Sequence, residues 1–193
     1  MDHSLTADDQ LVAHVAEGDA SALEALYDRY VRQCFGLALR MVGDPALSEE
    51  VVQEVFLKVW TRPGSYSNTK GKFVSWLLSL IHHRCIDELR RRSRTEVALE
   101  DPDTGSVLDT AHDPDPEPAD QVWVMEQQRA VRAALEKIPP NQRQVLELAY
   151  YRGLSHSEIA ANLGQPLGTV KTRIRLGMQS LRQLLEPQGL LTD

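Results

Sequence analysis

Polar and cationic side chains suited to reading DNA follow one another at helical intervals near the C-terminus. They are Thr169, Lys171, Thr172, Arg173, Arg175 and Gln179. Arginine and lysine donate hydrogen bonds to guanine edges and phosphates, and the threonine methyl group can contact that of thymine. Residues 165–185 hold four cations and no acid, although the whole chain has a formal net charge of −7. This chemistry suits a nucleic acid, and a solvated basic helix face is the alternative reading.

These side chains need a helix whose opposite face is buried. Apolar residues expected to face the core recur at intervals of three and four: Leu167, Val170, Ile174, Met178, Leu181 and Leu185. Upstream, Ser155 and Glu158 have the spacing of a capping box, and the short helix that they begin should break at Gly164. A capped short helix, a glycine turn and a longer basic helix are typical of a helix-turn-helix.

Charge is segregated along the rest of the chain. Residues 1–61 contain eleven acids and four bases, which gives −7, whereas residues 62–94 contain eight bases and two acids, which gives +6. Residues 96–120 hold nine acids, four prolines and neither Lys nor Arg. Such a segment buries too little apolar surface to fold and is predicted to be a linker. Basic segments on both sides of it predict two nucleic-acid-facing domains, at 7–95 and 121–187.

The hydrophobic periodicity is helical throughout, so the predicted fold class is all-α. Ser21 with Glu24 has capping-box spacing, and Ser48 followed by two glutamates is expected to begin another helix that stops at Pro63. A third helix is predicted from Phe73 to about residue 92. After the linker, helices are expected at Val124 to Ile138 and around Val145 to Ala149, the latter closed by Gly153. One alternative for residues 90–92 is that these arginines only compensate a helix dipole.

Three stretches resemble regions of the extracytoplasmic-function (ECF) sigma factors of the bacterial sigma-70 family, in the family's order. SEEVVQEVFLKVW resembles region 2.2, FVSWLLSLIHHRCIDELRRR resembles regions 2.3 and 2.4, and SEIAANLGQPLGTVKTRIRLGMQSLR resembles the region 4 helix-turn-helix. The resemblance implies an alternative sigma factor that binds core RNA polymerase and directs promoter-specific transcription initiation. It also implies promoter DNA as a ligand and an anti-sigma factor that holds the protein inactive until a stress signal.

The resemblance also assigns roles to particular residues. Region 4 would read the minus-35 element with the six residues named first. Region 2.2 would bind core polymerase with Glu49, Glu50, Gln53, Glu54 and Phe56. The minus-10 element would be melted and read by Ser67, Asn68, Lys70, Lys72, Phe73, His83, Arg84, Arg90 and Arg91. The alternative for Phe56 is a core position, and Trp76 is expected in the core.

Two positions depart from the family's pattern. His83 stands where many members carry asparagine, and Leu176 stands where an arginine often stands. Histidine and asparagine present different donors and acceptors, so the minus-10 preference cannot be copied from other members. The main minus-35 readers are therefore expected to be Lys171, Thr172 and Arg175.

Other classes of function fit less well. His82, His83 and Cys85 would be the start of a metal site, but adjacent side chains diverge on a helix, and the sequence has no phosphate loop or nucleophile elbow. We therefore expect no enzyme, no metal and no cofactor. A stand-alone DNA-binding regulator is the stronger rival, and residues 48–94 discriminate against it, because a regulator does not need a polymerase-type motif followed by a second basic helix.

Cysteine usage and hydropathy bear on the compartment. Cys34 and Cys85 form no CxxC pair, and each is expected to be a small buried residue in a reducing environment. No stretch approaches the ~18 apolar residues that a membrane span requires. We therefore expect a cytoplasmic protein with no membrane insertion.

Overall fold

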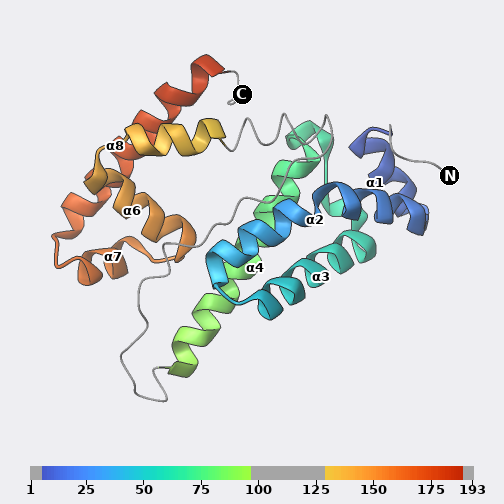
Figure 1. Cartoon of the computed structure of the whole chain (residues 1–193), viewed down its shortest axis with the longest axis horizontal. Helices are drawn as coiled ribbons and strands as arrows, with labels where there is room; N and C mark the ends of the chain where they lie inside the picture. Colours follow the sequence, from blue (N-terminus) through green and yellow to red (C-terminus); the bar gives the residue numbers. More distant parts are fainter. Residues whose placement is uncertain (1–5, 97–128, 189–193) are drawn as a thin grey trace. The chain divides into compact units, whose positions relative to one another are not determined.

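The computed structural model describes residues 6–96 and 129–188, which form helices and turns (Figure 1). Within these ranges no strand occurs, and the predicted all-α class is confirmed. The chain divides into two compact units, Met1–Asp109 and Thr110–Asp193. Val124 and all of the predicted linker except Glu96 lie outside the described residues. Among the helices described, none combines the length and apolarity that crossing a membrane requires.

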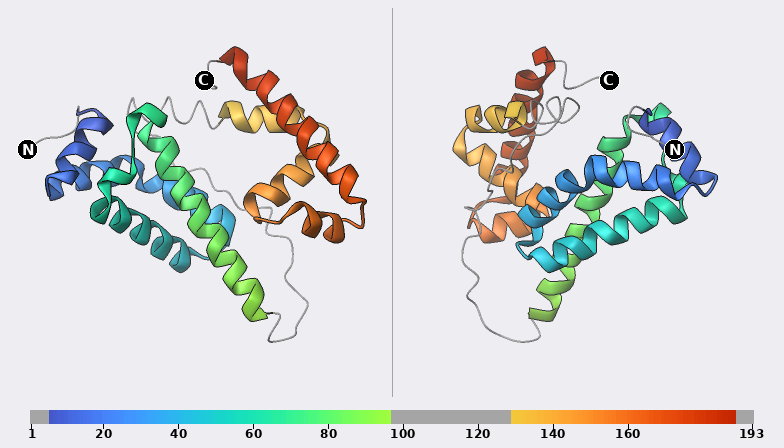
Figure 2. Two further views of the ribbon diagram at one scale, coloured as in Figure 1. Left: turned by 180° about the vertical axis from the view of Figure 1, so that it is seen from behind. Right: turned by 45° about the vertical axis from the view of Figure 1, so that its right-hand side comes forward.

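The first unit is a helical bundle in which one long helix, Ala20–Val42, packs against the other helices. Its elements are α1 (Asp8–Ala16), α2 (Ala20–Val42), α3 (Pro45–Thr61), the short 3-10 turns η1 (Pro63–Ser65) and η2 (Asn68–Lys70), and α4 (Phe73–Glu96). α2 packs against α1, α3 and α4, and α3 also packs against α4 (Figures 1 and 2). The side chains at the centre of this core are Leu11, Leu26, Cys34, Met41, Val51, Val59, Phe73, Leu77, Ile81 and Cys85.

Aspartates, not serines, begin two of these helices, so both predicted starts are wrong. The side chain of Asp19 caps α2 and accepts from the Ser21 amide at 2.9 Å. The side chain of Asp44 caps α3 and accepts from the amides of Ala46 and Leu47. Ser48 is buried inside α3, and its hydroxyl donates to the Asp44 carbonyl at 2.7 Å. Aspartate caps as well as serine does, and the proline after Asp44 suits the first helical position.

The second unit contains the helix-turn-helix. Residues 129–137 are helical and are followed by α6 (Pro140–Tyr151), α7 (His156–Asn162), α8 (Leu167–Leu185) and the short η3 (Glu186–Gln188). The predicted capping box of α7 is confirmed, because Ser155 and Glu158 bond each other's backbone amides at 3.3 and 2.6 Å. Gly153 and Gly164 have φ values of 61° and 60°, in the left-handed region where glycine is favoured.

The buried face of α8 differs from the predicted one. Val170 and Leu185 are buried as expected, but Met178 is 56% exposed and Leu167 is also exposed, so the prediction is wrong for these two. Met178 is exposed because its neighbour Gly177 is the residue that is buried where α6 packs against α8. A Cβ atom at position 177 would stand 2.8 Å from Cδ1 of Leu146. Glycine carries no hydrophobic signal, so the sequence pattern assigned this contact to the neighbouring methionine.

Candidate nucleic-acid and polymerase interfaces

The exposed face of α8 carries most of the predicted minus-35 residues. Lys171, Thr172, Arg175 and Gln179 are exposed, and Thr169 is half-buried. The Thr172 hydroxyl donates to the Gly168 carbonyl at 2.9 Å, which fixes this side chain on its helix. Four of the six predicted residues are thus placed where a DNA groove could reach them.

Arg173 has a different environment from its neighbours. It is half-buried, and its guanidinium donates to the side-chain oxygen of Gln165 in the turn between α7 and α8. This contact holds the turn in a fixed position relative to α8. Arg173 therefore positions the helix-turn-helix, and its donor to Gln165 is engaged within the unit.

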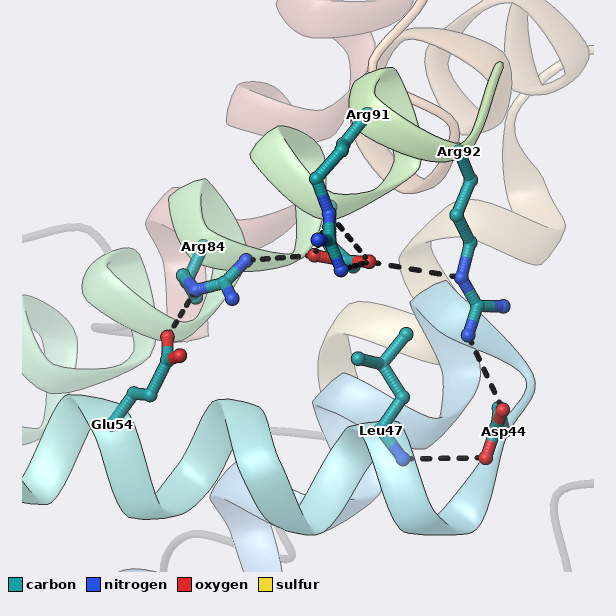
Figure 3. A network of polar contacts seen from close by, with 7 residues as sticks. Asp44, Leu47, Glu54, Arg84, Arg91 and Arg92 are labelled. Carbon is teal, nitrogen blue, oxygen red and sulfur yellow. Dashed lines mark hydrogen bonds and ion pairs between the residues drawn. The ribbon is translucent and has the colours of Figure 1, made fainter. Parts of the chain in front are cut away.

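Three arginines of α4 form one network with carboxylates from α3, from its N-cap and from α4 itself (Figure 3). Arg84 is bonded to Glu54 of α3 and also donates to Glu88 at 3.2 Å. Arg92 lies 3.2 Å from Asp44 and 3.8 Å from Glu88. The sixth member, Arg91, donates to Glu88 at 2.8 Å. We call these six residues the arginine network.

Glu88 is the centre of this network and was not predicted from the sequence. Its side chain is the fully buried member of the set, with 1% of the residue exposed. Burying a carboxylate is costly unless it is paired and hydrogen-bonded, and here arginines satisfy it from three positions. The available signal was its i, i+3 and i, i+4 spacing to arginines on both sides, at 84, 91 and 92.

The network also sets the protonation of its carboxylates. The Arg91 side chain, and after it Arg84, hold the pKa of Glu88 below its ordinary value despite burial. Arg84 likewise lowers the pKa of Glu54, and this pairing in turn raises the pKa of Arg84. The pKa of Asp44 is lowered chiefly by the amide hydrogen bond from Leu47. The three carboxylates are therefore charged at neutral pH.

Acidification is expected to destabilise the first unit through this network. A carboxylate with a depressed folded-state pKa stabilises the fold above its unfolded pKa, which is about 4.3 for glutamate, and this stability is lost as the pH falls further through the folded value. In a Trp123→Phe background, Trp60 and Trp76 fluorescence would follow urea unfolding of this unit between pH 7 and pH 3. In Glu88→Gln the free energy of unfolding should change less with pH. If this variant loses as much stability between pH 7 and pH 3 as the wild type does, Glu88 is not the source of the acid sensitivity.

The loop between α3 and α4 is held by a tyrosine that sequence reasoning missed. The Tyr66 hydroxyl donates to Asp9 at 2.7 Å and lies 3.2 Å from the Gly71 carbonyl oxygen. Burial and the Asp9 contact raise the pKa of Tyr66 to about 12. Its ring packs against Phe73 and Trp76 at centroid distances of 5.4 and 5.5 Å. The aromatic spacing before Phe73 was the signal that could have found it.

The predicted minus-10 residues are therefore divided between surface and core. Asn68, Lys70, Lys72, His83, Arg90 and Arg91 are exposed, while Ser67 and Arg84 are half-buried. The Nδ1 atom of His83 lies 2.6 Å from the Ser79 carbonyl. Phe73 is 1% exposed, so the prediction that its ring contacts DNA does not fit its place in the core. Phe73 begins α4, and its ring is enclosed because it packs against Tyr66 of the loop and Tyr30 of α2. Trp76 is half-buried rather than fully in the core.

The predicted polymerase-binding residues lie on α3, where Gln53 and Phe56 line an apolar groove, while Glu50 and Glu54 lie on the side of α3 that faces α4. Glu49, Glu50, Gln53 and Glu54 are exposed, whereas Phe56 is a core residue, as its alternative reading had it. Sequence reasoning missed the groove, which has a volume of about 350 Å³ and is lined by Ala20, Leu23, Tyr27, Gln53, Phe56, Leu57 and Trp60. Leu57 is 60% exposed at its edge. The helix α3 therefore offers an apolar groove along one side and acids toward α4.

Cys34 and Cys85 are buried free thiols and form no disulfide. Burial raises the pKa of Cys34 to about 12 and that of Cys85 to about 11. Both therefore behave as small core residues, as the sequence predicted. In residues 6–96 and 129–188, no cluster of three or more His, Cys, Asp or Glu side chains could hold a metal ion.

Comparison with known proteins gives the same family for both units. The family model "Sigma-70 region 2" matches residues 26–95, and "Sigma-70, region 4" matches residues 128–181. The ECF RNA polymerase sigma factor SigK of Mycolicibacterium vanbaalenii is 36% identical over 177 residues, covering 92% of this chain and 88% of the relative. SigK of Mycobacterium tuberculosis is 34% identical over 185 residues, covering 92% and 93%.

A solved structure is also similar. Rhodobacter sphaeroides SigE, in complex with the anti-sigma ChrR, is 25% identical, with a TM-score of 0.45, covering 92% of this chain and 97% of that chain. The two matched regions and the identity to SigK over most of the chain show the family. The chain belongs to the ECF RNA polymerase sigma factors of the sigma-70 family.

Proposed function

We propose that this protein is an alternative sigma factor that binds core RNA polymerase and directs it to promoters with minus-10 and minus-35 elements. Residues 7–95 form the domain that binds polymerase and opens the minus-10 region, and residues 121–187 form the domain that reads minus-35. The observation that carries the proposal is a single chain with two separate cationic helices, α4 and α8, the first of which lies beside an acidic and apolar helix, α3.

The minus-35 role is assigned to the exposed face of α8. Lys171 and Arg175 pair with guanine edges or phosphates, and the methyl group of Thr172 contacts thymine. Thr169 and Gln179 extend the same face toward the two ends of the contact. Arg173 acts indirectly, by holding the turn through Gln165.

The minus-10 and polymerase roles are assigned to neighbouring surfaces of the first unit. Asn68, Lys70, Lys72, His83, Arg90 and Arg91 face the promoter strand, with Ser67 and Arg84 beside them. The acids of α3 meet arginines of a polymerase helix pair, and the apolar groove accepts its apolar side chains. Tyr27 and Leu57 are added to the predicted set because they line this groove.

The protein acts by binding and not by catalysis, and it works in the cytoplasm, where polymerase and promoter DNA meet. An anti-sigma factor would hold it inactive by covering the polymerase-facing groove. This part of the proposal rests on family membership and predicts competition between an anti-sigma factor and core polymerase for α3.

Run-off transcription tests the proposal directly. Core polymerase with and without the protein is incubated with a library of promoter-length DNA at fixed moderate salt. We expect transcripts that depend on the protein and come from templates sharing two spaced motifs, because α4 and α8 read separate elements. Sequencing the transcripts would give both motifs.

The rival function predicts a different result. A stand-alone regulator would bind DNA through α8 without starting transcription from core polymerase alone. Binding without initiation would therefore overturn the roles given to α3 and α4 and leave only the helix-turn-helix. A chain with Lys171 and Arg175 both changed to alanine is the control for transcripts that do not need minus-35 contacts.

A further inference from the structure

Glu88 anchors an arginine that points its charge to the surface. The Arg91 Nη2 atom donates to one carboxylate oxygen of Glu88 at 2.8 Å, and Nε lies within hydrogen-bond distance of both oxygens. The Arg91 side chain is 72% exposed, whereas that of Glu88 is 2% exposed. A buried carboxylate thus holds one edge of an exposed guanidinium in place.

The same carboxylate also restrains the two other arginines of the network. Arg84 Nη1 lies 3.2 Å from Oε2 of Glu88, and Arg92 Nε lies 3.8 Å from Oε1. Arg84 and Arg92 are each tied at their other side to α3, through Glu54 and Asp44 (Figure 3). Glu88 therefore lies among α4 cations that would otherwise repel one another, while Glu54 and Asp44 fix Arg84 and Arg92 relative to α3.

An arginine that is held in place before DNA binds contributes differently to affinity and to selectivity than a mobile one does. A free arginine side chain loses much rotamer freedom when it is immobilised on a ligand, whereas one that is already held loses less. A held guanidinium also reaches only the phosphates and base edges that match its position, while a loose one follows any phosphate. Pairing with a carboxylate further reduces the cationic charge that is available for nonspecific attraction to DNA.

We propose that Glu88 is a positioning residue for promoter recognition, which orients Arg91 toward the minus-10 DNA, holds Arg84 in place and limits the nonspecific cationic charge of α4. Glu88 does not itself contact DNA. This role rests on the proposed sigma-factor function and adds to it a residue that sets specificity from inside the first unit.

The test compares two changes at one position in the holoenzyme. Glu88→Gln keeps the size and removes the charge, whereas Glu88→Asp keeps the charge and draws it back by one methylene. Each holoenzyme is titrated with a promoter fragment and with the same fragment carrying a scrambled minus-10 element, across a series of KCl concentrations. The readouts are the salt slope on scrambled DNA and the ratio of the two affinities. Asp87→Asn, at an exposed position of the same helix, is the matched control for loss of one acid.

Both variants should lower the ratio of affinities about fivefold or more, the lower end of what one well-placed arginine contact adds to discrimination. Glu88→Gln should also steepen the salt slope by about 0.9, the contribution of one further phosphate contact. Glu88→Asp should keep the wild-type slope. Asp87→Asn should keep the wild-type ratio, and any slope change that it shows is subtracted.

A structural role alone would lower the melting temperature without moving the ratio, so a wild-type ratio in folded Glu88→Asp overturns the proposal. If Glu88→Gln does not fold, Glu88→Asp decides the question by itself. If the wild-type holoenzyme shows no preference for the promoter over the scrambled fragment, the sigma-factor function itself is overturned. That outcome is distinct from one in which the wild type prefers the promoter and the Glu88 variants do so equally, which overturns only the role of Glu88.

Discussion

Replacing Lys171 or Arg175 with alanine is expected to relax minus-35 recognition while binding to core polymerase persists. Both side chains are exposed on α8, in the second unit, and the groove and acids assigned to polymerase lie in the first. A well-placed arginine or lysine contact to guanine contributes about 1–3 kcal/mol of discrimination, which corresponds to roughly 5- to 150-fold in affinity. Run-off transcription on templates with single changes in the minus-35 element would measure the loss.

The chain offers a matched control on the same helix. Arg182 is an exposed cation of α8 that pairs with Glu186 at 3.0 Å, lies about two helical turns beyond Arg175 and is not one of the predicted minus-35 residues. Arg182→Ala should therefore leave the ranking of minus-35 sequences unchanged, with at most a uniform loss in affinity. Should Arg175→Ala reduce binding to core polymerase as much as it reduces promoter selection, the division of roles between the two units would be wrong.

A large side chain at position 177 is expected to destabilise the second unit and with it all minus-35 binding. Gly177 lies against α6, and a Cβ atom there would already meet Cδ1 and Cγ of Leu146 at 2.8 and 3.2 Å and Cβ of Gln142 at 3.4 Å. Gly177→Leu places three further carbons in this contact, and overpacking of this kind costs about 1–3 kcal/mol. The better helix propensity of leucine offsets roughly 1 kcal/mol of that.

Thermal unfolding followed by circular dichroism would measure this effect. A net loss of up to about 2 kcal/mol should lower the midpoint of a small unit by several degrees. Gly168→Ala is the control, because it lies on the same helix and its added Cβ would meet nothing within 4 Å. That change should be neutral or stabilise the helix by up to about 1 kcal/mol. If Gly177→Leu melts like Gly168→Ala, the close approach of α6 and α8 is not a constraint on stability.

The sequence predicted those parts of the fold that depend on local chemistry. The Ser155 capping box, the left-handed glycines and the basic face of α8 are all set by neighbours within a few residues. The starts of α2 and α3 were missed because Asp19 and Asp44 compete with nearby serines for the same capping role, and propensity alone does not rank them. Met178 and Gly177 show the other limit, since a close helix crossing is invisible to a pattern of apolar residues.

The candidate site was predictable by residue type and not by partner. The cations of α4 and the acids of α3 could each be named from the sequence, and a surface role suits either set alone. Only the packing of α3 on α4 shows that Glu54 pairs with Arg84. It also shows that Glu88, an acid of α4, is buried and paired with the same arginine. Phe73 was assigned to DNA for the opposite reason, because an aromatic residue beside a basic loop looks the same in sequence whether it stacks on a base or on Tyr66.

The pairing of Glu54 with Arg84 links two surfaces that are assigned to different molecules. One partner lies on the face assigned to polymerase and the other on the helix assigned to the promoter. A substitution of Arg84 removes the cation that pairs with Glu54, whereas a substitution of Glu54 leaves Arg84 paired with Glu88. On these assignments, a change of Arg84 that alters promoter preference would also alter the polymerase-facing side of α3, so the two properties would evolve together.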